Sequence, residues 1–256
     1  MSAAAASQDI WVYCQGEQHI QALSGTLYRL VESQEQVATL HYVDTLEEQA
    51  LLEDLLEQVK PAHPSPVDGL HYLLKTPFRY PPLAWGSRFG RTHEPSIFYA
   101  GGTVAVTLAE AAYYRFVFWY SMQSAPIKPH LRSEHTLFSA AYRCTRGIRL
   151  QEPPFQAAQA QLRHPQQYAT TQLLGSAMRA AEIEAFEYVS VRDPDAGICI
   201  GLFTPRALRS KKPSAMHQWL CEITTDLVQF RRFGDKETHA FPLSIFLVDG
   251  KLPLPA

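Results

Sequence analysis

The chain has 256 residues, of which 46% are hydrophobic and 19% are charged, and this composition is typical of a globular protein rather than a disordered, collagenous or coiled-coil one. Its 23 Lys and Arg residues nearly balance its 25 Asp and Glu residues, for a formal net charge of -2. This balance gives no general electrostatic reason to bind nucleic acid or an anionic membrane. The N-terminus does not resemble a signal peptide, and the four cysteines form no CxxC pair. We therefore expect a cytoplasmic protein that contacts neither nucleic acid nor membrane directly.

The first half of the chain predicts two strands and a helix between them. A strand is expected at residues 26–32, where apolar and aromatic side chains flank Arg29. The sequence Thr45-Leu46-Glu47-Glu48 matches a capping box, and leucines continue the helical pattern until three prolines end it. Residues 75–102 contain too much proline and glycine for a long helix, and residues 96–100 favour a strand.

Residues 103–121 predict a helix that is apolar nearly all round, which indicates burial on every side, with Glu110 as the exception. The later elements expected are a strand at 136–143, a helix at 166–183, paired strands at 185–191 and 198–204, and further strands near 220–230 and 243–248. Strands and helices alternate irregularly, so the predicted class is α+β rather than a regular βαβ array.

Glu110 is the first candidate for chemistry, because an ionised carboxylate inside an apolar helix is costly to bury unless it is paired or hydrogen-bonded. One interpretation is a structural ion pair with Arg115 or another nearby arginine. The other is a catalytic carboxylate that points into a pocket. The helical pattern does not decide between them.

Three arginines, Arg79, Arg88 and Arg91, cluster upstream among aromatic residues and glycines. A guanidinium group binds phosphate through two parallel hydrogen bonds, and glycines let the backbone approach closely. Each arginine alone is explained as well by solvation or by stacking on an aromatic ring, but together they favour an anion-binding wall.

Tyr99 and Ser190 have ordinary structural explanations, which are core packing for a strand tyrosine and turn capping for the serine. No GxSxG sequence surrounds Ser190, which disfavours a serine hydrolase.

The absence of HExxH disfavours metal catalysis, and no metal site is predicted. The chain also lacks the glycine patterns of P-loop and Rossmann proteins.

The order of several short motifs resembles the RES domain, a family of toxins from bacterial RES–Xre toxin–antitoxin pairs. Equal spacings of eleven residues separate Arg88, Tyr99 and Glu110, as in that family. The resemblance covers about residues 26–250 and is carried by Arg29, Gly86-Ser87-Arg88-Phe89-Gly90, Ile97-Phe98-Tyr99-Ala100, Leu108-Ala109-Glu110, Tyr188-Val189-Ser190-Val191-Arg192-Asp193-Pro194 and Gly197-Ile198-Cys199-Ile200-Gly201-Leu202-Phe203.

The resemblance implies a single domain with an ADP-ribosyltransferase-like α+β fold, a mixed sheet core with flanking helices. On this basis the RES domain is expected at residues 26–256, with an N-terminal extension at 1–25 and an insertion at about 33–83. The implied substrate is NAD+, cleaved between nicotinamide and ribose with no cofactor. Inorganic phosphate, water or a protein is the implied acceptor.

Carried over residue by residue, the resemblance assigns Glu110 to the ribose and its oxocarbenium-like cation, and Arg29 and Arg88 to the pyrophosphate or the phosphate nucleophile. Arg79 is expected to replace or supplement Arg29. Tyr99 is assigned to the nicotinamide ring. Ser190 is assigned to the nicotinamide ribose or carboxamide, and Glu110, Arg88 and Ser190 together are expected to be the catalytic residues.

The implied partner is an Xre-type helix-turn-helix antitoxin that blocks the NAD+ cleft. The inserted helix is expected either to contact a second copy or the antitoxin, or to cover the sheet edge, and both a homodimer and a toxin–antitoxin hetero-oligomer stay open. Three functions compete: an NAD+-consuming phosphorylase or glycohydrolase that arrests growth until neutralised, a protein ADP-ribosyltransferase, and a non-catalytic nucleotide-binding module.

Overall fold

The structure is a computed structural model, and it describes residues 9–33, 42–62, 67, 69–124, 126 and 128–254. Its centre is one eight-stranded mixed sheet with the order β1-β2-β5-β4-β3-β6-β7-β8. The strands are β1 (Gln21–Glu32), β2 (Phe98–Gly101), β3 (Leu131–Arg149), β4 (Ala185–Val189), β5 (Ile198–Leu202), β6 (Ala215–Ile223), β7 (Leu227–Arg232) and β8 (His239–Pro242). The helices are α1 (Ile10–Tyr13), α2 (Leu46–Val59), α3 (Tyr72–Lys75), α4 (Val104–Tyr120), α5 (Gln159–Leu162) and α6 (Ala169–Ala180). The predicted α+β class is confirmed.

The long strand β3 organises the sheet, because it pairs with β1 and β6 in antiparallel orientation and with β4 in parallel orientation. The β1–β3 pairing joins the two ends of the series β1-β2-β5-β4-β3 and closes these five strands into a ring. Strands β6, β7 and β8 extend the sheet beyond this ring.

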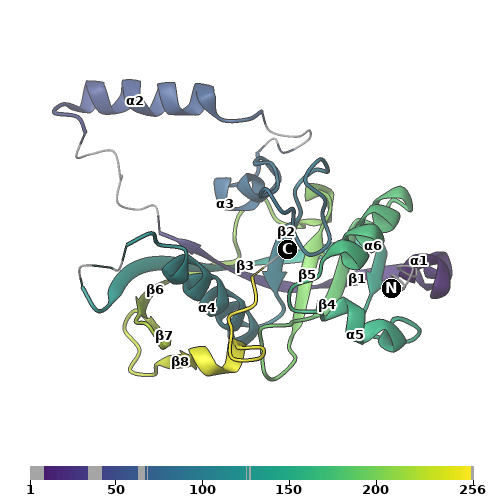
Figure 1. The fold of residues 1–256 in the computed structure, drawn as a ribbon. Coiled ribbons are helices and arrows are strands. Elements are labelled where there is room, and N and C mark those ends of the chain that lie inside the picture. The colour runs from purple at the N-terminus through teal and green to yellow at the C-terminus, as the bar shows by residue number, and fades with distance from the viewer. Residues whose placement is uncertain are drawn as a thin grey trace.

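Three clusters of buried side chains form the core. One packs α1, α5 and α6 against β4 and β5, a second lies beneath α3, and the third lies between α4 and the strands β6 and β7. Figure 1 shows α4 on one part of the sheet and α5 and α6 on another, with strands visible between them and α3 near the top of the sheet. Helix α4 and the turn after β4 thus approach one another where two of these clusters meet.

Helix α4 begins after Thr103, whose Oγ1 accepts a hydrogen bond from the N–H of Val106 at 3.3 Å. One side of the helix is buried through residues such as Leu108, Ala112 and Phe116. The prediction that the helix is buried on every side is wrong, because Tyr114, Phe118 and Tyr120 are about half exposed.

The second half of the chain follows the predicted order with two differences. Strands β4 and β5 form the expected antiparallel pair. The expected strand near residues 220–230 is instead a hairpin of β6 and β7, closed by a bond from the N–H of Thr224 to the carbonyl of Leu227. The strand expected at 243–248 is wrong, because Leu243–Phe246 forms a 3-10 helix after the strand β8 ends at Pro242.

The boundary expected at residue 25 does not coincide with a break in the structure. Helix α1 is capped by the Asp9 carboxylate, and its Ile10 and Trp11 side chains are buried in the core cluster of α5 and α6. Strand β1 begins at Gln21. Residues 10–25 therefore belong to the same packed unit as the rest of the sheet.

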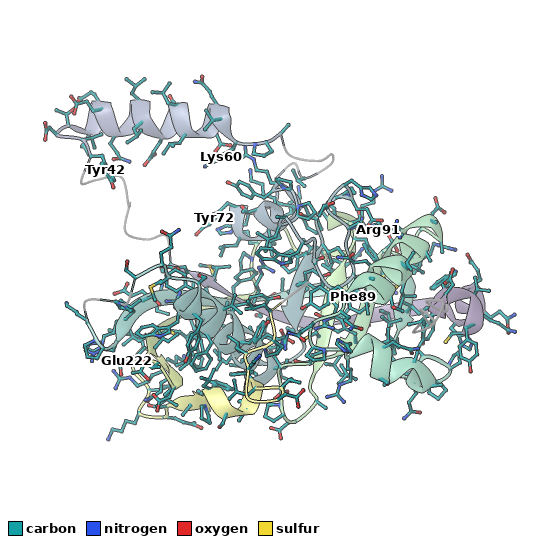
Figure 2. All side chains as sticks on the ribbon, in the orientation of Figure 1. Tyr42, Lys60, Tyr72, Phe89, Arg91 and Glu222 are labelled. Atoms are coloured by element: carbon teal, nitrogen blue, oxygen red, sulfur yellow. The ribbon has the colours of Figure 1, made fainter. Side chains whose placement is uncertain are left out.

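Helix α2 is the predicted capped helix, and it lies within the expected insertion. Thr45 Oγ1 accepts a hydrogen bond from the N–H of Glu48 at 3.1 Å, as the capping box requires. The helix stands apart from the sheet in Figure 1, and Figure 2 labels Tyr42 and Lys60 at its two ends. Its apolar side is exposed at Leu51, Leu55 and Val59, so it does not cover the sheet edge.

Candidate active site

The centre of the candidate site is a hydrogen bond between α4 and the turn that follows β4. Ser190 Oγ donates to Glu110 Oε1 at 2.5 Å. Ser190 is completely buried, whereas Glu110 is partly accessible. The structure therefore brings together two of the predicted site residues and makes the serine a donor to the carboxylate.

The turn at residues 190–197 is built to hold Ser190 in this position. Besides donating to Glu110, Ser190 Oγ accepts hydrogen bonds from the backbone N–H groups of Arg192 at 3.1 Å and Asp193 at 3.0 Å. The Asp193 carboxylate in turn accepts from the N–H of Gly197 at 2.9 Å. A Cβ at Gly197 would lie 2.5 Å from Asp193 Oδ2, so the glycine allows this close approach.

A second donor, the Cys199 thiol, lies 3.8 Å from the same oxygen of Glu110. Burial raises the pKa of this thiol well above its ordinary value, and the Glu110 charge acts in the same direction. The thiol is thus protonated at neutral pH and donates weakly to the carboxylate. Glu110 Oε1 takes both donors, while Oε2 has no hydrogen-bond partner among the residues that the structure describes.

The ion-pair interpretation of Glu110 is not supported. Arg115 pairs with Glu32 instead, at 3.7 Å. Within the described part of the chain, no Lys, Arg or His side chain lies within 4.0 Å of the Glu110 carboxylate. Glu110 is thus a partly accessible carboxylate that is oriented by two neutral donors and has no cationic partner among the described residues. Such a carboxylate is available to interact with a positively charged group of a ligand.

Arg88 lies beside this centre on the segment between α3 and β2. Figure 2 labels the neighbouring Phe89, which points into the interior, and Arg91, which lies farther out. Arg88 Nη1 donates to the carbonyl oxygens of Leu162 at 3.3 Å and His164 at 2.8 Å. Its guanidinium stacks over the Tyr168 ring at 4.6 Å from the centroid.

Arg192 is a functional candidate that the sequence reasoning did not select. Its guanidinium lies 3.6 Å from the centroid of the buried Tyr113 ring, and its Nη2 donates to the carbonyl of Pro165 at 2.7 Å. Burial raises the pKa of Tyr113 to about 12. The charges of Arg192 and Arg88 lower this pKa, and the charge of Glu110 raises it. The sequence signal was its place two residues after Ser190 in the Ser190-Val191-Arg192 motif.

Tyr99 anchors the segment that carries Arg88. Its hydroxyl lies 2.9 Å from Ser87 Oγ and accepts a hydrogen bond from the N–H of Phe89 at 3.1 Å. Burial raises the pKa of Tyr99 to about 12, so the hydroxyl keeps its proton at neutral pH. The side chain packs edge-on against Tyr188, so its contacts support the arginine loop.

Arg29 and Arg79 lie elsewhere. Arg29 lies over the Phe98 ring at 5.2 Å and donates to the carbonyl of Tyr99; burial lowers its pKa to about 10. Since Phe98 and Tyr99 are adjacent on β2, their side chains point to opposite faces of the sheet, and Arg29 lies on the Phe98 side. Arg79 binds the end of the insertion, with Nη1 2.6 Å from Glu57. The structure does not bring either arginine to Glu110.

Other features of the molecule are separate from this centre. A groove of about 750 Å³ lies over β3, β6 and β7; it is lined by residues such as Arg132, Glu222 and Arg231, and Glu110 is not among its lining residues. In the described residues no three His, Cys, Asp or Glu side chains gather as a metal site. None of the described helices combines the length and apolarity needed to cross a membrane.

Comparison with known proteins places the chain in a family. The RES domain model matches residues 63–224, which include Arg88, Tyr99, Glu110, Ser190 and Arg192. No curated protein matches the chain. A chain of the M. tuberculosis MbcT-MbcA toxin-antitoxin complex matches with 11% identity and a TM-score of 0.46, over 86% of this chain and 95% of that chain. Because the family match spans more than half of its residues, the protein belongs to the RES domain family.

Proposed function

We propose that this protein is a RES-type toxin that cleaves the bond between nicotinamide and ribose in NAD+ and transfers the ADP-ribose to inorganic phosphate or water. The observation that supports this proposal most directly is the Glu110 carboxylate. Ser190 and Cys199 hold its Oε1, and Oε2 is free of partners among the described residues. Two arginines, Arg88 and Arg192, lie near it, since their charges and that of Glu110 all act on the Tyr113 hydroxyl, and neither pairs with a described carboxylate within 4.0 Å.

The chemistry matches this arrangement. When the C1′–N bond of the nicotinamide ribose breaks, the electron pair goes to the pyridinium nitrogen and nicotinamide leaves neutral, so no acid is needed to protonate it. Positive charge develops on the ribose. A fixed carboxylate stabilises that charge more in the transition state than in the ground state, and this difference accelerates the reaction.

The second half of the reaction consumes the ribosyl cation. An oxygen of inorganic phosphate forms the new bond to C1′ and gives ADP-ribose-1-phosphate, or water forms it and gives ADP-ribose with release of one proton. In this proposal Glu110 and Arg88 are the catalytic residues. Ser190 is a positioning residue, because it is buried and contacts Glu110 rather than open space.

Membership of the RES domain family supports a proposed biological role in a toxin–antitoxin pair. We propose that NAD+ loss arrests growth and that an Xre-type helix-turn-helix antitoxin neutralises the protein by covering Glu110. This part of the proposal is tested by purification of the protein with its genomic neighbour and by NAD+ assays of the pair. Loss of activity in the complex supports it, and full activity in a stable complex contradicts it.

The enzymatic proposal is tested by a proton NMR time course of the purified protein with NAD+, in the presence and absence of inorganic phosphate. Nicotinamide with ADP-ribose-1-phosphate indicates phosphorolysis, and nicotinamide released equally without phosphate indicates hydrolysis. The Glu110→Gln protein is expected to release nicotinamide much more slowly than the wild-type protein, with or without phosphate. Unchanged NAD+ with the wild-type protein, or full activity of the Glu110→Gln protein, contradicts the proposal.

A further inference from the structure

Arg88 and Arg192 converge on one short loop although they belong to distant parts of the chain. Arg88 donates to the carbonyl of His164 at 2.8 Å, and Arg192 donates to the carbonyl of Pro165 at 2.7 Å. These carbonyls belong to consecutive residues, whose Cα atoms are about 3.8 Å apart. The two guanidinium groups are thereby held at neighbouring points beside Glu110.

Neither guanidinium is neutralised. In the described ranges, no carboxylate lies within 4.0 Å of Arg88 or Arg192, whereas Arg79, Arg115 and Arg149 each pair with a glutamate. The charges of Arg88, Arg192 and Glu110 all act on the Tyr113 hydroxyl, so two arginines without a carboxylate pair lie in the same neighbourhood as Glu110. Positive charge that no carboxylate pairs with favours an anionic ligand.

The N–H groups of Arg192 are also available. Only Nη2 forms a hydrogen bond with a described residue, and the stacking on Tyr113 uses the flat face of the guanidinium rather than its edge. The Nε atoms of Arg29 and Arg115 are buried without partners, but no nitrogen of Arg192 or Arg88 is in that state. The Arg192 side chain is only 6% exposed, but its unbonded nitrogens, like Nε of Arg88, keep some solvent-accessible surface through which an acceptor can approach.

We propose that Arg192 is a second phosphate-binding residue, which acts with Arg88 on the phosphate oxygens of the ligand that occupies the Glu110 site. The shared chemistry is a phosphate group, whether it comes from the diphosphate of a dinucleotide or from free inorganic phosphate. In this proposal Arg192 has the phosphate-binding role that the resemblance to the RES domain assigned to Arg29 or Arg79. The inference rests on the proposed function for the identity of the ligand, but not for the presence of an anion site.

The test measures binding by calorimetry with three probes: ADP, inorganic phosphate, and adenosine as the ligand without phosphate. For Arg192→Gln we expect affinity for ADP to fall about tenfold or more, since a hydrogen-bonded charge is lost, with adenosine binding unchanged. Arg192→Lys keeps the charge and loses the planar fork, so an intermediate loss is expected. Arg115→Gln is the matched control, because Arg115 also stacks on an aromatic ring, Phe118, but pairs with Glu32.

The pattern across the probes identifies the source of the phosphate. A loss confined to ADP indicates the diphosphate of the dinucleotide, and a loss confined to inorganic phosphate indicates the co-substrate. Unchanged affinity for both probes in folded Arg192→Gln and Arg192→Lys proteins overturns the inference, as does an equal loss in Arg115→Gln. A wild-type protein that binds neither ADP nor phosphate also overturns it. Wild-type protein that binds ADP but leaves NAD+ intact contradicts the proposed function and leaves the anion site in place.

Discussion

Ser190 Oγ and Glu110 Oε1 lie 2.5 Å apart although 80 residues separate them in the chain. The bond connects the middle of α4 to the turn after β4, and the serine is sealed from solvent while the carboxylate is not. One side chain therefore fixes another at the point where a positive charge is expected to develop. This relationship explains why a glutamate on an apolar helix is tolerated, because its hydrogen-bond needs are partly met by a preformed turn.

Replacement of Ser190 by Ala is expected to lower kcat by about tenfold or more with a smaller change in KM, because Glu110 loses its orienting donor and acts mainly in the transition state. The N–H groups of Arg192 and Asp193 also lose their acceptor, so the free energy of unfolding should fall by roughly 1–3 kcal/mol. Steady-state NAD+ kinetics and urea unfolding measure the two effects. If Ser190→Ala raises KM alone, Ser190 contacts the substrate and is not a positioning residue.

Replacement of Glu110 by Gln should reduce nicotinamide release by about 10²–10³-fold, the loss typical of one electrostatic stabiliser, while the fold is retained. The matched control is Glu187→Gln. Glu187 is a buried glutamate that accepts from Tyr142 at 2.8 Å and pairs with Arg149 at 3.2 Å, away from the site. That variant should lose stability, by about 1–3 kcal/mol, but keep its kcat. Similar kcat losses in both variants would mean that the Glu110 effect is structural.

Replacement of Tyr99 by Phe removes the hydroxyl that joins Ser87 Oγ to the N–H of Phe89 and so loosens the segment that carries Arg88. We expect KM for NAD+ to rise about three- to tenfold, with kcat changed less, since the loss acts through the position of a binding group. Tyr142→Phe is a suitable control, because it removes another buried tyrosine hydroxyl that bonds to Glu187. If the tyrosine ring itself stacked on nicotinamide, Tyr99→Phe would retain full activity.

The sequence predicted those parts of the candidate site that depend on short, contiguous motifs. Thr103 caps α4 and the Asp-Pro-Asp-Ala-Gly turn follows β4, so Glu110 and Ser190 could be placed on their elements, and family resemblance suggested that they meet. The role proposed for Arg192 depends on its stacking over Tyr113 and on the lack of a described carboxylate within 4.0 Å, and both are tertiary properties that the sequence does not show. Arg29 was placed in the site by order alone, whereas strand alternation sends it to the Phe98 side of the sheet.

Secondary structure could be predicted where the hydrophobic pattern extends over several turns, as in α2, and could not where an apolar run is only a few residues long. The capping box and leucine pattern of α2 gave its start correctly, but nothing in that pattern told whether its apolar side is covered. At the C-terminal end, a four-residue apolar run at Leu243–Phe246 suits a strand as well as a 3-10 helix. Such short runs carry no usable period.

Arg79 is expected to have no catalytic part, because its guanidinium binds Glu57 and the carbonyl of Pro61 at the end of the α2 insertion. Arg79→Gln should therefore leave kcat and KM for NAD+ within about twofold of the wild-type values. It should also detach α2, which limited proteolysis at the segments flanking the helix measures as faster cleavage. A large rise in KM without any change in proteolysis would support the phosphate-binding role that the resemblance to the RES domain implied for Arg79.

His135 makes stability depend on pH. It is buried, with Ser133 Oγ 2.9 Å from its Nε2 and the Phe230 ring in a T-shaped arrangement with its own at 6.1 Å between centroids. Burial lowers its pKa to about 4, and the charge of Arg115 adds to this effect. The unfolded chain, with a histidine pKa near 6.5, binds the proton first as pH falls, so the associated stability is fully present above about pH 6.5 and is lost progressively toward pH 4.

The expected loss between pH 7 and pH 4 is on the order of 2–3 kcal/mol in the free energy of unfolding. Urea unfolding at a series of pH values measures it, and His135→Gln should flatten this part of the profile. His93→Gln is the control, since His93 is exposed on the loop before β2. The same slope in wild-type and His135→Gln proteins would show that another group carries the pH dependence. A slope reduced equally by both substitutions would exclude burial of His135 as its cause.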